Sequence, residues 1–144
     1  MNILVQKLSP TATIPQKMTE NASGFDLFAD IGEPIILNPL EWRQISTGIA
    51  LEIPVGYEAQ IRPRSGLSST LGLSILNSPG TIDSDYRGEI KVILINLSPN
   101  PLRIEPEMRV AQIVFCPIIS PQLIEAQALS ESLRQDGGFG HTGQ

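Results

Sequence analysis

The stretch ILNSPGTIDSDYRGEIKV, residues 75–92, holds the highest density of side chains that could do chemistry. Apolar residues flank Asn77, Ser78, Pro79 and Gly80, a pattern that predicts a tight β-hairpin in which Gly80 can adopt a positive φ. A hairpin tip exposes backbone N–H and C=O groups. These groups could recognise a planar ligand by its hydrogen-bonding edge.

Two carboxylates and one aromatic ring follow the tip. Strand alternation would place Asp83 and Asp85 on one side and Tyr86 on the other, unless the strand bulges. An acid beside the apolar Ile82 is a reasonable general base. A solvated turn with acidic residues explains the same spacing, so both interpretations stay open here.

A second polar cluster lies in IRPRSGLS, residues 61–68, at the start of a short helix predicted over residues 65–72. Ser65 would be the N-cap of that helix. The same geometry would offer free N–H groups, the Ser65 hydroxyl and the Arg64 guanidinium to one anion. The two roles are compatible.

Two polar residues stand in strands that are otherwise apolar. Asp26 lies in ASGFDLFAD, residues 22–30, and needs a partner: a cation, a hydrogen-bond donor or a hydrated metal. Gln112 lies in RVAQIVF, residues 109–115, where its amide also needs a partner. Each is a weak signal alone.

The chain ends in RQDGGFGHTGQ, residues 134–144, which places glycines among cationic and hydroxyl side chains. Such a segment can wrap phosphate oxygens with bare N–H groups. His141 is the only histidine, which excludes a multi-histidine metal site. A hard cation held mainly by the phosphates of a substrate remains open.

The elements that must position these residues are β-strands. Segments rich in Ile, Val and Leu alternate with Pro, Gly, Ser and Asn, and helical periodicity is nearly absent. This pattern predicts an all-β sandwich, jelly roll or barrel. The predicted strands are NILVQKL, FDLFAD, PIILNP, QISTGIALEIP, YEAQIRPR, LSILN, EIKVILINL, LRIEP and RVAQIVFCPI.

Composition limits the setting in which these elements act. A length of 144 residues fits one domain, predicted over residues 1–118, and the weaker pattern after it predicts a C-terminal arm over residues 119–144. A net charge of −5 makes a nucleic-acid partner improbable. With no signal peptide, no membrane-spanning stretch and one cysteine, a cytoplasmic protein is expected.

Taken in order, five of these stretches resemble the motifs of the trimeric dUTPase family. They are ASGFDLFAD, PRSGLS, GTIDSDYRGEI, RVAQIVF and RQDGGFGHTG, and they span residues 22–143. The resemblance implies hydrolysis of dUTP to dUMP and pyrophosphate by a homotrimer of jelly-roll-like distorted β-barrels. It also implies active sites shared between subunits, with the fifth motif arriving on the flexible C-terminal arm of a neighbour as a lid.

The resemblance assigns roles around the nucleoside. Asp83 matches the general base that activates water for attack on the α-phosphorus, and Tyr86 matches the ring under the deoxyribose that excludes UTP. The matching uracil-binding residues, with Lys91 on the following strand, are Asn77, Gly80, Thr81, Ile82 and Asp83.

The resemblance also assigns roles around the phosphates. Asp26 matches a carboxylate that reaches Mg²⁺ through water, while the metal is chelated mostly by the triphosphate. Phe139 would stack over the uracil. The residues matched to phosphate binding or to the closing tail are Arg64, Ser65, Gly66, Gln112, Arg134, Gly140, His141 and Thr142.

Two departures and two alternatives accompany the resemblance. Gln135 stands where the family usually has glycine after the arginine, and Ser23 is an extra residue before Gly24. A relative of dCTP deaminase would share the fold, but it would normally use a glutamate as its base. A nucleotide-binding trimer without catalysis would have no use for Asp83 beside the hairpin.

Overall fold

The computed structural model describes residues 1–137 of the chain. Within that range it contains eleven β-strands and one short helix, which confirms the predicted all-β class. The elements are β1 (Leu4–Lys7), β2 (Phe25–Phe28), β3 (Ile35–Leu37), β4 (Trp42–Ser46), β5 (Ile49–Glu52), β6 (Tyr57–Arg62), α1 (Ser65–Leu71), β7 (Leu73–Ile75), β8 (Gly80–Ile82), β9 (Lys91–Asn96), β10 (Leu102–Ile104) and β11 (Arg109–Pro117).

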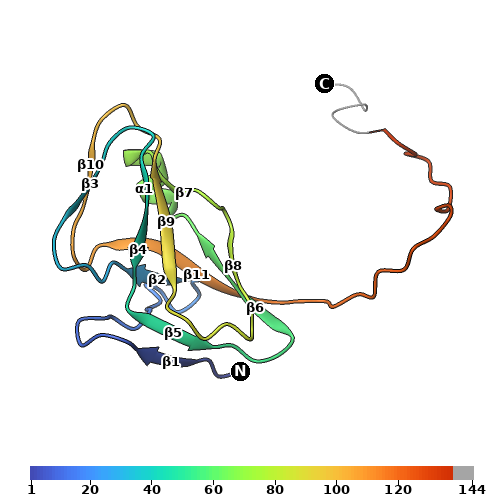
Figure 1. Ribbon diagram of the computed structural model, residues 1–144, viewed down its shortest axis with the longest axis horizontal. Helices are drawn as coiled ribbons and strands as arrows, with labels where there is room; N and C mark the ends of the chain where they lie inside the picture. Colours follow the sequence, from blue (N-terminus) through green and yellow to red (C-terminus); the bar gives the residue numbers. More distant parts are fainter. Residues whose placement is uncertain (138–144) are drawn as a thin grey trace.

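The strands form two larger sheets and two small ones, all of them antiparallel. The larger sheets have the orders β2-β11-β6-β8 and β4-β9-β7, while β1 pairs with β5 and β10 with β3. In Figure 1, β4 and β9 run steeply across β6 and β11, and the sheets wrap around one interior as a jelly-roll-like distorted β-barrel. Strands distant in sequence are therefore neighbours.

Alternating side chains of the two larger sheets build the core. On β9, Val92 and Leu94 are fully buried, whereas Ile93 between them is half-buried on the outer face. Ile113 of β11 belongs to the same buried cluster. Each such aliphatic side chain stabilises the fold by about 1.5–3 kcal/mol. The core therefore holds the outward-facing residues of these strands in place.

The single strand predicted over residues 44–54 is in fact two strands, β4 and β5. Gly48 between them has φ +64°, which ends β4, and an added Cβ would lie 2.1 Å from Asp30 Oδ2. L-residues with a side chain rarely adopt this conformation. The break allows β4 to pair with β9 while β5 pairs with β1 in another sheet.

The hairpin predicted around residues 77–80 is also wrong as a two-stranded unit. β7 pairs with β9 and β8 pairs with β6, so the segment connects two different sheets. The Ser78–Pro79 peptide bond is cis, and Gly80 does not have a positive φ. Gly80 is instead packed closely, because an added Cβ would lie 3.2 Å from Asn77 Nδ2. The flanking apolar residues predicted two strands correctly, but they did not indicate which strands would pair with them.

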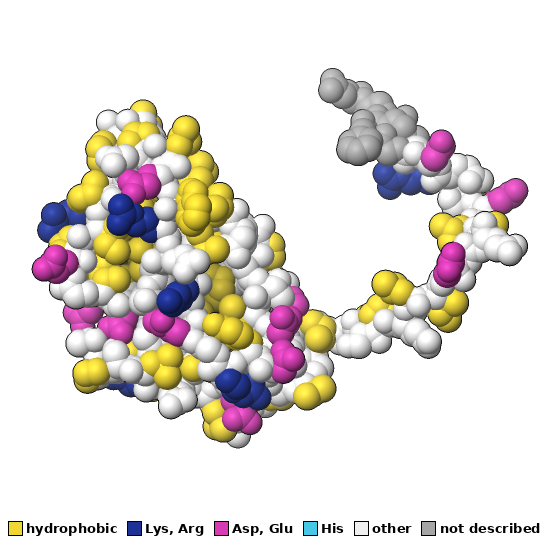
Figure 2. Space-filling view, in the orientation of Figure 1, with side chains coloured by type: hydrophobic (Ala, Val, Ile, Leu, Met, Phe, Trp, Pro, Cys, Tyr) yellow, Lys and Arg dark blue, Asp and Glu magenta, His cyan; other side chains and the backbone are white. Residues whose placement is uncertain are grey.

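Beyond Pro117, residues 118–137 contain no helix or strand and run away from the barrel (Figure 1). Apolar and acidic side chains are spaced along this segment (Figure 2), and Leu123 and Leu129 are 92% and 90% exposed. Over residues 1–137, no helix is long and apolar enough to cross a membrane.

Candidate active site

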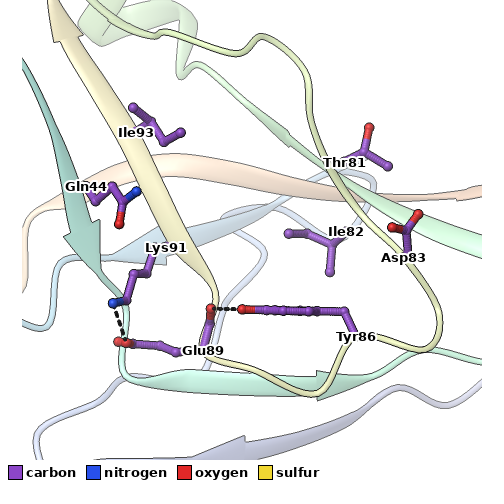
Figure 3. Close-up of a pocket in the computed structure, with 8 residues that line it drawn as sticks. All are labelled: Gln44, Thr81, Ile82, Asp83, Tyr86, Glu89, Lys91 and Ile93. Carbon is purple, nitrogen blue, oxygen red and sulfur yellow. Dashed lines mark hydrogen bonds and ion pairs between the residues drawn. The ribbon is translucent and has the colours of Figure 1, made fainter.

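Several of the predicted site residues line one cavity of about 290 Å³. Asp83 and Tyr86 come from the loop after β8, and Lys91 comes from the outer face of β9 (Figure 3). The lining residues are Gln44, Thr81, Ile82, Asp83, Tyr86, Glu89, Lys91 and Ile93. The cavity offers two carboxylates, an ammonium group, a phenol ring and an aliphatic wall. Asn77 and Gly80 do not line it.

Asp83 and Tyr86 lie on one turn, not on opposite faces of a strand. β8 ends at Ile82, and the Tyr86 N–H donates to the Asp83 carbonyl at 3.2 Å. Strand alternation therefore does not apply to these residues, and that part of the sequence prediction is wrong. The turn brings both side chains to the same cavity. Within residues 1–137 the Asp83 carboxylate has no hydrogen-bond or ion-pair partner, so its oxygens are available to a ligand or a water.

The Tyr86 ring lies across Gly88. Its hydroxyl donates to the Glu89 carbonyl oxygen at 3.0 Å. A Cβ added to Gly88 would lie 2.4 Å from the Tyr86 hydroxyl oxygen and 2.6 Å from the ring carbon that carries it. Real Cβ atoms do not approach so closely, so glycine is required at this position for the ring to keep its place in the cavity.

Glu89 is a site residue that sequence reasoning missed. Its Oε2 lies 3.6 Å from Lys91 Nζ (Figure 3). Its Oε1 accepts from the Gly48 N–H at 3.1 Å. Gln44 and Ile93 were also missed, and they face each other across the β4–β9 pair. Glu89 stands two residues before Lys91, a spacing that could have signalled a side chain on the same face.

A second pocket, of about 200 Å³, gathers the predicted phosphate-binding residues. Its lining is Met18, Asp26, Arg64, Ser65, Gly66 and Gln112. Asp26 is only 8% exposed, and its Oδ1 accepts from Arg64 Nε at 3.1 Å. The predicted need of Asp26 for a partner is confirmed, and among the three kinds of partner left open the structure shows a cation. The pocket combines a carboxylate, a guanidinium, a hydroxyl and an amide.

Helix α1 begins beside this pocket, but Ser65 is not its N-cap. Arg64 occupies the cap position with extended backbone, and the cap makes no side-chain hydrogen bond, so the predicted capping role of Ser65 is wrong. Ser65 is exposed at the first helical position. Nearby, Gln112 Nε2 donates to the Pro63 carbonyl at 2.9 Å, which ties β11 to the segment before α1.

The second pocket offers few protein groups that could bind a divalent cation. Residues 1–137 contain no group of three His, Cys, Asp or Glu side chains placed to hold a metal ion. Each oxygen of Asp26 already accepts one hydrogen bond from an arginine. A carboxylate has about four lone-pair sites, so room is left for a bridging water. The site therefore suits a cation carried by a ligand, not a cation caged by the protein.

The two pockets share no lining residue among those described. One chain thus presents the Asp83 cavity and the Arg64 pocket as separate surfaces. Arg134 lies on the C-terminal segment, where its Nε donates to the Gly137 carbonyl at 2.7 Å. Gln135 has φ +47°, in the left-handed region that favours glycine. Phe139, Gly140, His141 and Thr142 lie outside the described residues.

Comparison with known proteins identifies the family of this chain. The dUTPase family model matches residues 10–143. A deoxyuridine 5'-triphosphate nucleotidohydrolase of Hydrogenobaculum sp. is 54% identical over 143 residues, 99% of each chain. The chain belongs to the dUTPase family. Another dUTPase with this name, from Chlamydia pneumoniae, is 51% identical over 138 residues, 95% of each chain.

Solved dUTPases share the fold. The dUTPase of Staphylococcus bacteriophage 80alpha with dUPNHPP superposes with a TM-score of 0.90 at 30% identity, over 99% of each chain. A dUTPase from phage phi11 of S. aureus, described with a structural Mg(II) ion, superposes with a TM-score of 0.82 at 25% identity. That alignment covers 91% of this chain and 100% of the phage chain. The resemblance drawn from five motifs and the jelly-roll-like fold are both confirmed.

Proposed function

We propose that this protein hydrolyses dUTP to dUMP and pyrophosphate by attack of water on the α-phosphorus. The observation that carries the proposal is the Asp83 carboxylate, unpaired within residues 1–137, on a cavity that it shares with the Tyr86 ring. A general base needs a free acceptor close to the bound reactant. Membership in the dUTPase family supports this choice of substrate.

The nucleoside would occupy the Asp83 cavity. Tyr86 would lie under the deoxyribose and leave no room for a 2′-hydroxyl, and its fixed ring supports this role because a steric filter must not move. Backbone groups between Asn77 and Asp83 would contact the uracil edge, with Lys91 beside them. Mispaired polar groups and steric clashes discriminate more strongly than lost apolar contacts.

The phosphates would occupy the Arg64 pocket. Arg64 supplies charge, the Ser65 hydroxyl and the Gly66 N–H supply donors, and Gln112 supplies an amide. Mg²⁺ would be held by the triphosphate and reach Asp26 through water, and when bound it would neutralise phosphate charge. The site of Asp26 fits this water-mediated contact. Asp83 would hold the attacking water and take its proton.

The active site would be completed in a homotrimer. The nucleoside cavity and the phosphate pocket are separate on one chain, which supports a site assembled from more than one copy. The apolar side chains of residues 118–137 are exposed, which supports an arm that covers a neighbour. That arm would bring Arg134, Phe139, His141 and Thr142 over the substrate as a lid.

The test is pyrophosphate release from dUTP with Mg²⁺, with dCTP, dTTP and UTP measured at equal concentration. Release from dUTP alone is expected. Asp83→Asn should bind a non-hydrolysable dUTP analogue normally while kcat falls by about 10²–10⁴-fold, because the base is lost. Asp85→Asn, a change at an exposed acid two residues away that does not line the cavity, is the matched control.

Other outcomes would contradict the proposal. Near-normal turnover by Asp83→Asn would remove Asp83 from its role as base. Ammonia release from dCTP would favour a deaminase. Analogue binding without pyrophosphate release by the unaltered protein would favour a nucleotide-binding trimer without catalysis.

A further inference from the structure

The Asp26 carboxylate is shared by two guanidinium groups. Its Oδ1 accepts from Arg64 Nε at 3.1 Å, and its Oδ2 accepts from Arg109 Nη1 at 3.2 Å. Arg64 Nη1 also donates to the Arg109 carbonyl oxygen at 3.2 Å. The Arg109 side chain therefore contacts Asp26, and its backbone carbonyl contacts Arg64, although Arg109 does not line the phosphate pocket itself.

A local irregularity of β11 brings Arg109 to this position. Gln112 is opposite Asp26 on β2, and Arg109 is opposite Phe28, with a register shift between Arg109 and Ala111. Arg109, Val110 and Ala111 on β11 thus lie opposite only Phe28 and Leu27 on β2. Directly opposed residues of an antiparallel pair share a face, so the extra residue turns Arg109 to the face of Asp26. Regular alternation would have placed Val110 there instead.

Arg109 changes the charge that a ligand meets. Two guanidiniums and one carboxylate leave this cluster with a net charge of +1. Without Arg109, Asp26 and Arg64 would neutralise each other, and a poorly solvated carboxylate would face the incoming anion. Triphosphate carries several negative charges, so its binding depends on an excess of positive charge here.

We propose that Arg109 is a positioning residue for triphosphate binding: its side chain holds Asp26 through Oδ2, orients Arg64 through that shared carboxylate, and leaves the phosphate pocket net positive. The inference rests on the proposed function, since it assigns the Arg64 pocket to the phosphates of dUTP. Arg109 itself acts through Asp26 and Arg64. Its effect should therefore fall on phosphate binding and not on recognition of the nucleoside.

The first test measures the affinity of Arg109→Met for imido-dUTP, a non-hydrolysable analogue, in Mg²⁺-free buffer by calorimetry at two ionic strengths. Affinity should fall about tenfold, with a weaker dependence on salt, because one charge of a partly buried cluster is lost. Affinity for deoxyuridine, which has no phosphate, should change by less than about twofold. Arg109→Lys should recover part of the loss because it retains the charge.

Two further variants separate positioning from structural damage. Arg103→Met removes an arginine that pairs with Glu105 on the exposed face of β10, and it should bind the analogue like the unaltered protein. Asp26→Asn combined with Arg109→Met restores the net charge of +1 from Arg64 alone, two charges having been removed from the cluster. Analogue affinity of this double variant should exceed that of Arg109→Met. A purely structural role for Arg109 would not produce this recovery.

Three results would contradict the proposed role of Arg109. Analogue affinity of Arg109→Met equal to that of Arg103→Met would overturn the inference, as would an equal loss of deoxyuridine affinity or no recovery in the double variant. If Arg109→Met does not fold, the same comparison between Arg109→Lys and the unaltered protein decides, with no loss of analogue affinity overturning the inference. Pyrophosphate release by the unaltered protein would leave the proposed function standing in all these cases. Failure of the unaltered protein to bind the analogue would overturn both.

Discussion

At the residue scale, the position of the Tyr86 ring depends on the absence of a side chain at Gly88. Gly88→Ala should push the ring out of the cavity, because the new Cβ would lie 2.4 Å from the Tyr86 hydroxyl oxygen. Preference for dUTP over UTP, measured as the ratio of kcat/KM values, should fall about tenfold or more as the steric filter loosens. Melting temperature should change little, since Tyr86 is 45% exposed.

The matched control is Gly32→Ala, where an added Cβ meets no atom within 4 Å. That variant should retain the full preference for dUTP. Unchanged sugar selectivity in Gly88→Ala would show that the ring does not need its observed position, and the steric account of UTP exclusion would then fail.

At the element scale, the break between β4 and β5 depends on Gly48. Gly48→Ala adds a Cβ 2.1 Å from Asp30 Oδ2 and 2.7 Å from Ala12 Cβ, in a backbone conformation with φ +64°. The free energy of unfolding should decrease by about 2–4 kcal/mol, because backbone strain and a buried clash add. Chemical denaturation would measure this change.

Gly56→Ala provides the control for the backbone contribution. Gly56 has φ +89°, but an added Cβ meets no atom within 4 Å. Its substitution should cost only the strain of a positive φ, about 1–2 kcal/mol. A loss no larger at Gly48 than at Gly56 would mean that the Asp30 contact does not restrict the turn. A larger loss at Gly48 would assign the difference to the contacts with Asp30 and Ala12.

At the scale of the whole molecule, the proposed trimer predicts complementation between inactive variants. Asp83→Asn and Arg64→Met each disable one of the two pockets, which one chain presents separately. In trimers assembled from equal amounts of both chains, a site that draws Asp83 and Arg64 from different subunits would be intact in about a quarter of cases. Co-refolded mixtures should therefore recover pyrophosphate release.

Each variant refolded alone is the control, and neither should recover activity. A mixture that stays inactive while forming mixed trimers would show that Asp83 and Arg64 of one subunit serve the same site. Sedimentation of the mixture, with one chain carrying a mass tag, would establish that the trimers are mixed.

Much of this protein follows from local sequence. Alternating aliphatic residues and frequent prolines and glycines set the all-β class, because strand formation and its interruption depend on neighbouring residues. Five short motifs in order were enough to indicate the dUTPase family. The same resemblance assigned roles to Asp83, Tyr86, Arg64 and Ser65, and these roles stay predictions.

Tertiary structure decided how those groups meet. Asp26 reaches Arg64 across 38 residues and Arg109 across 83 residues of sequence. Strand pairing between sheets also separated β7 from β8, where local pattern had predicted one hairpin. Gln44 and Arg109 reach their sites through pairing with strands distant in sequence. Contacts between distant segments depend on the packing of the whole core and on a one-residue register shift, which local periodicity does not encode.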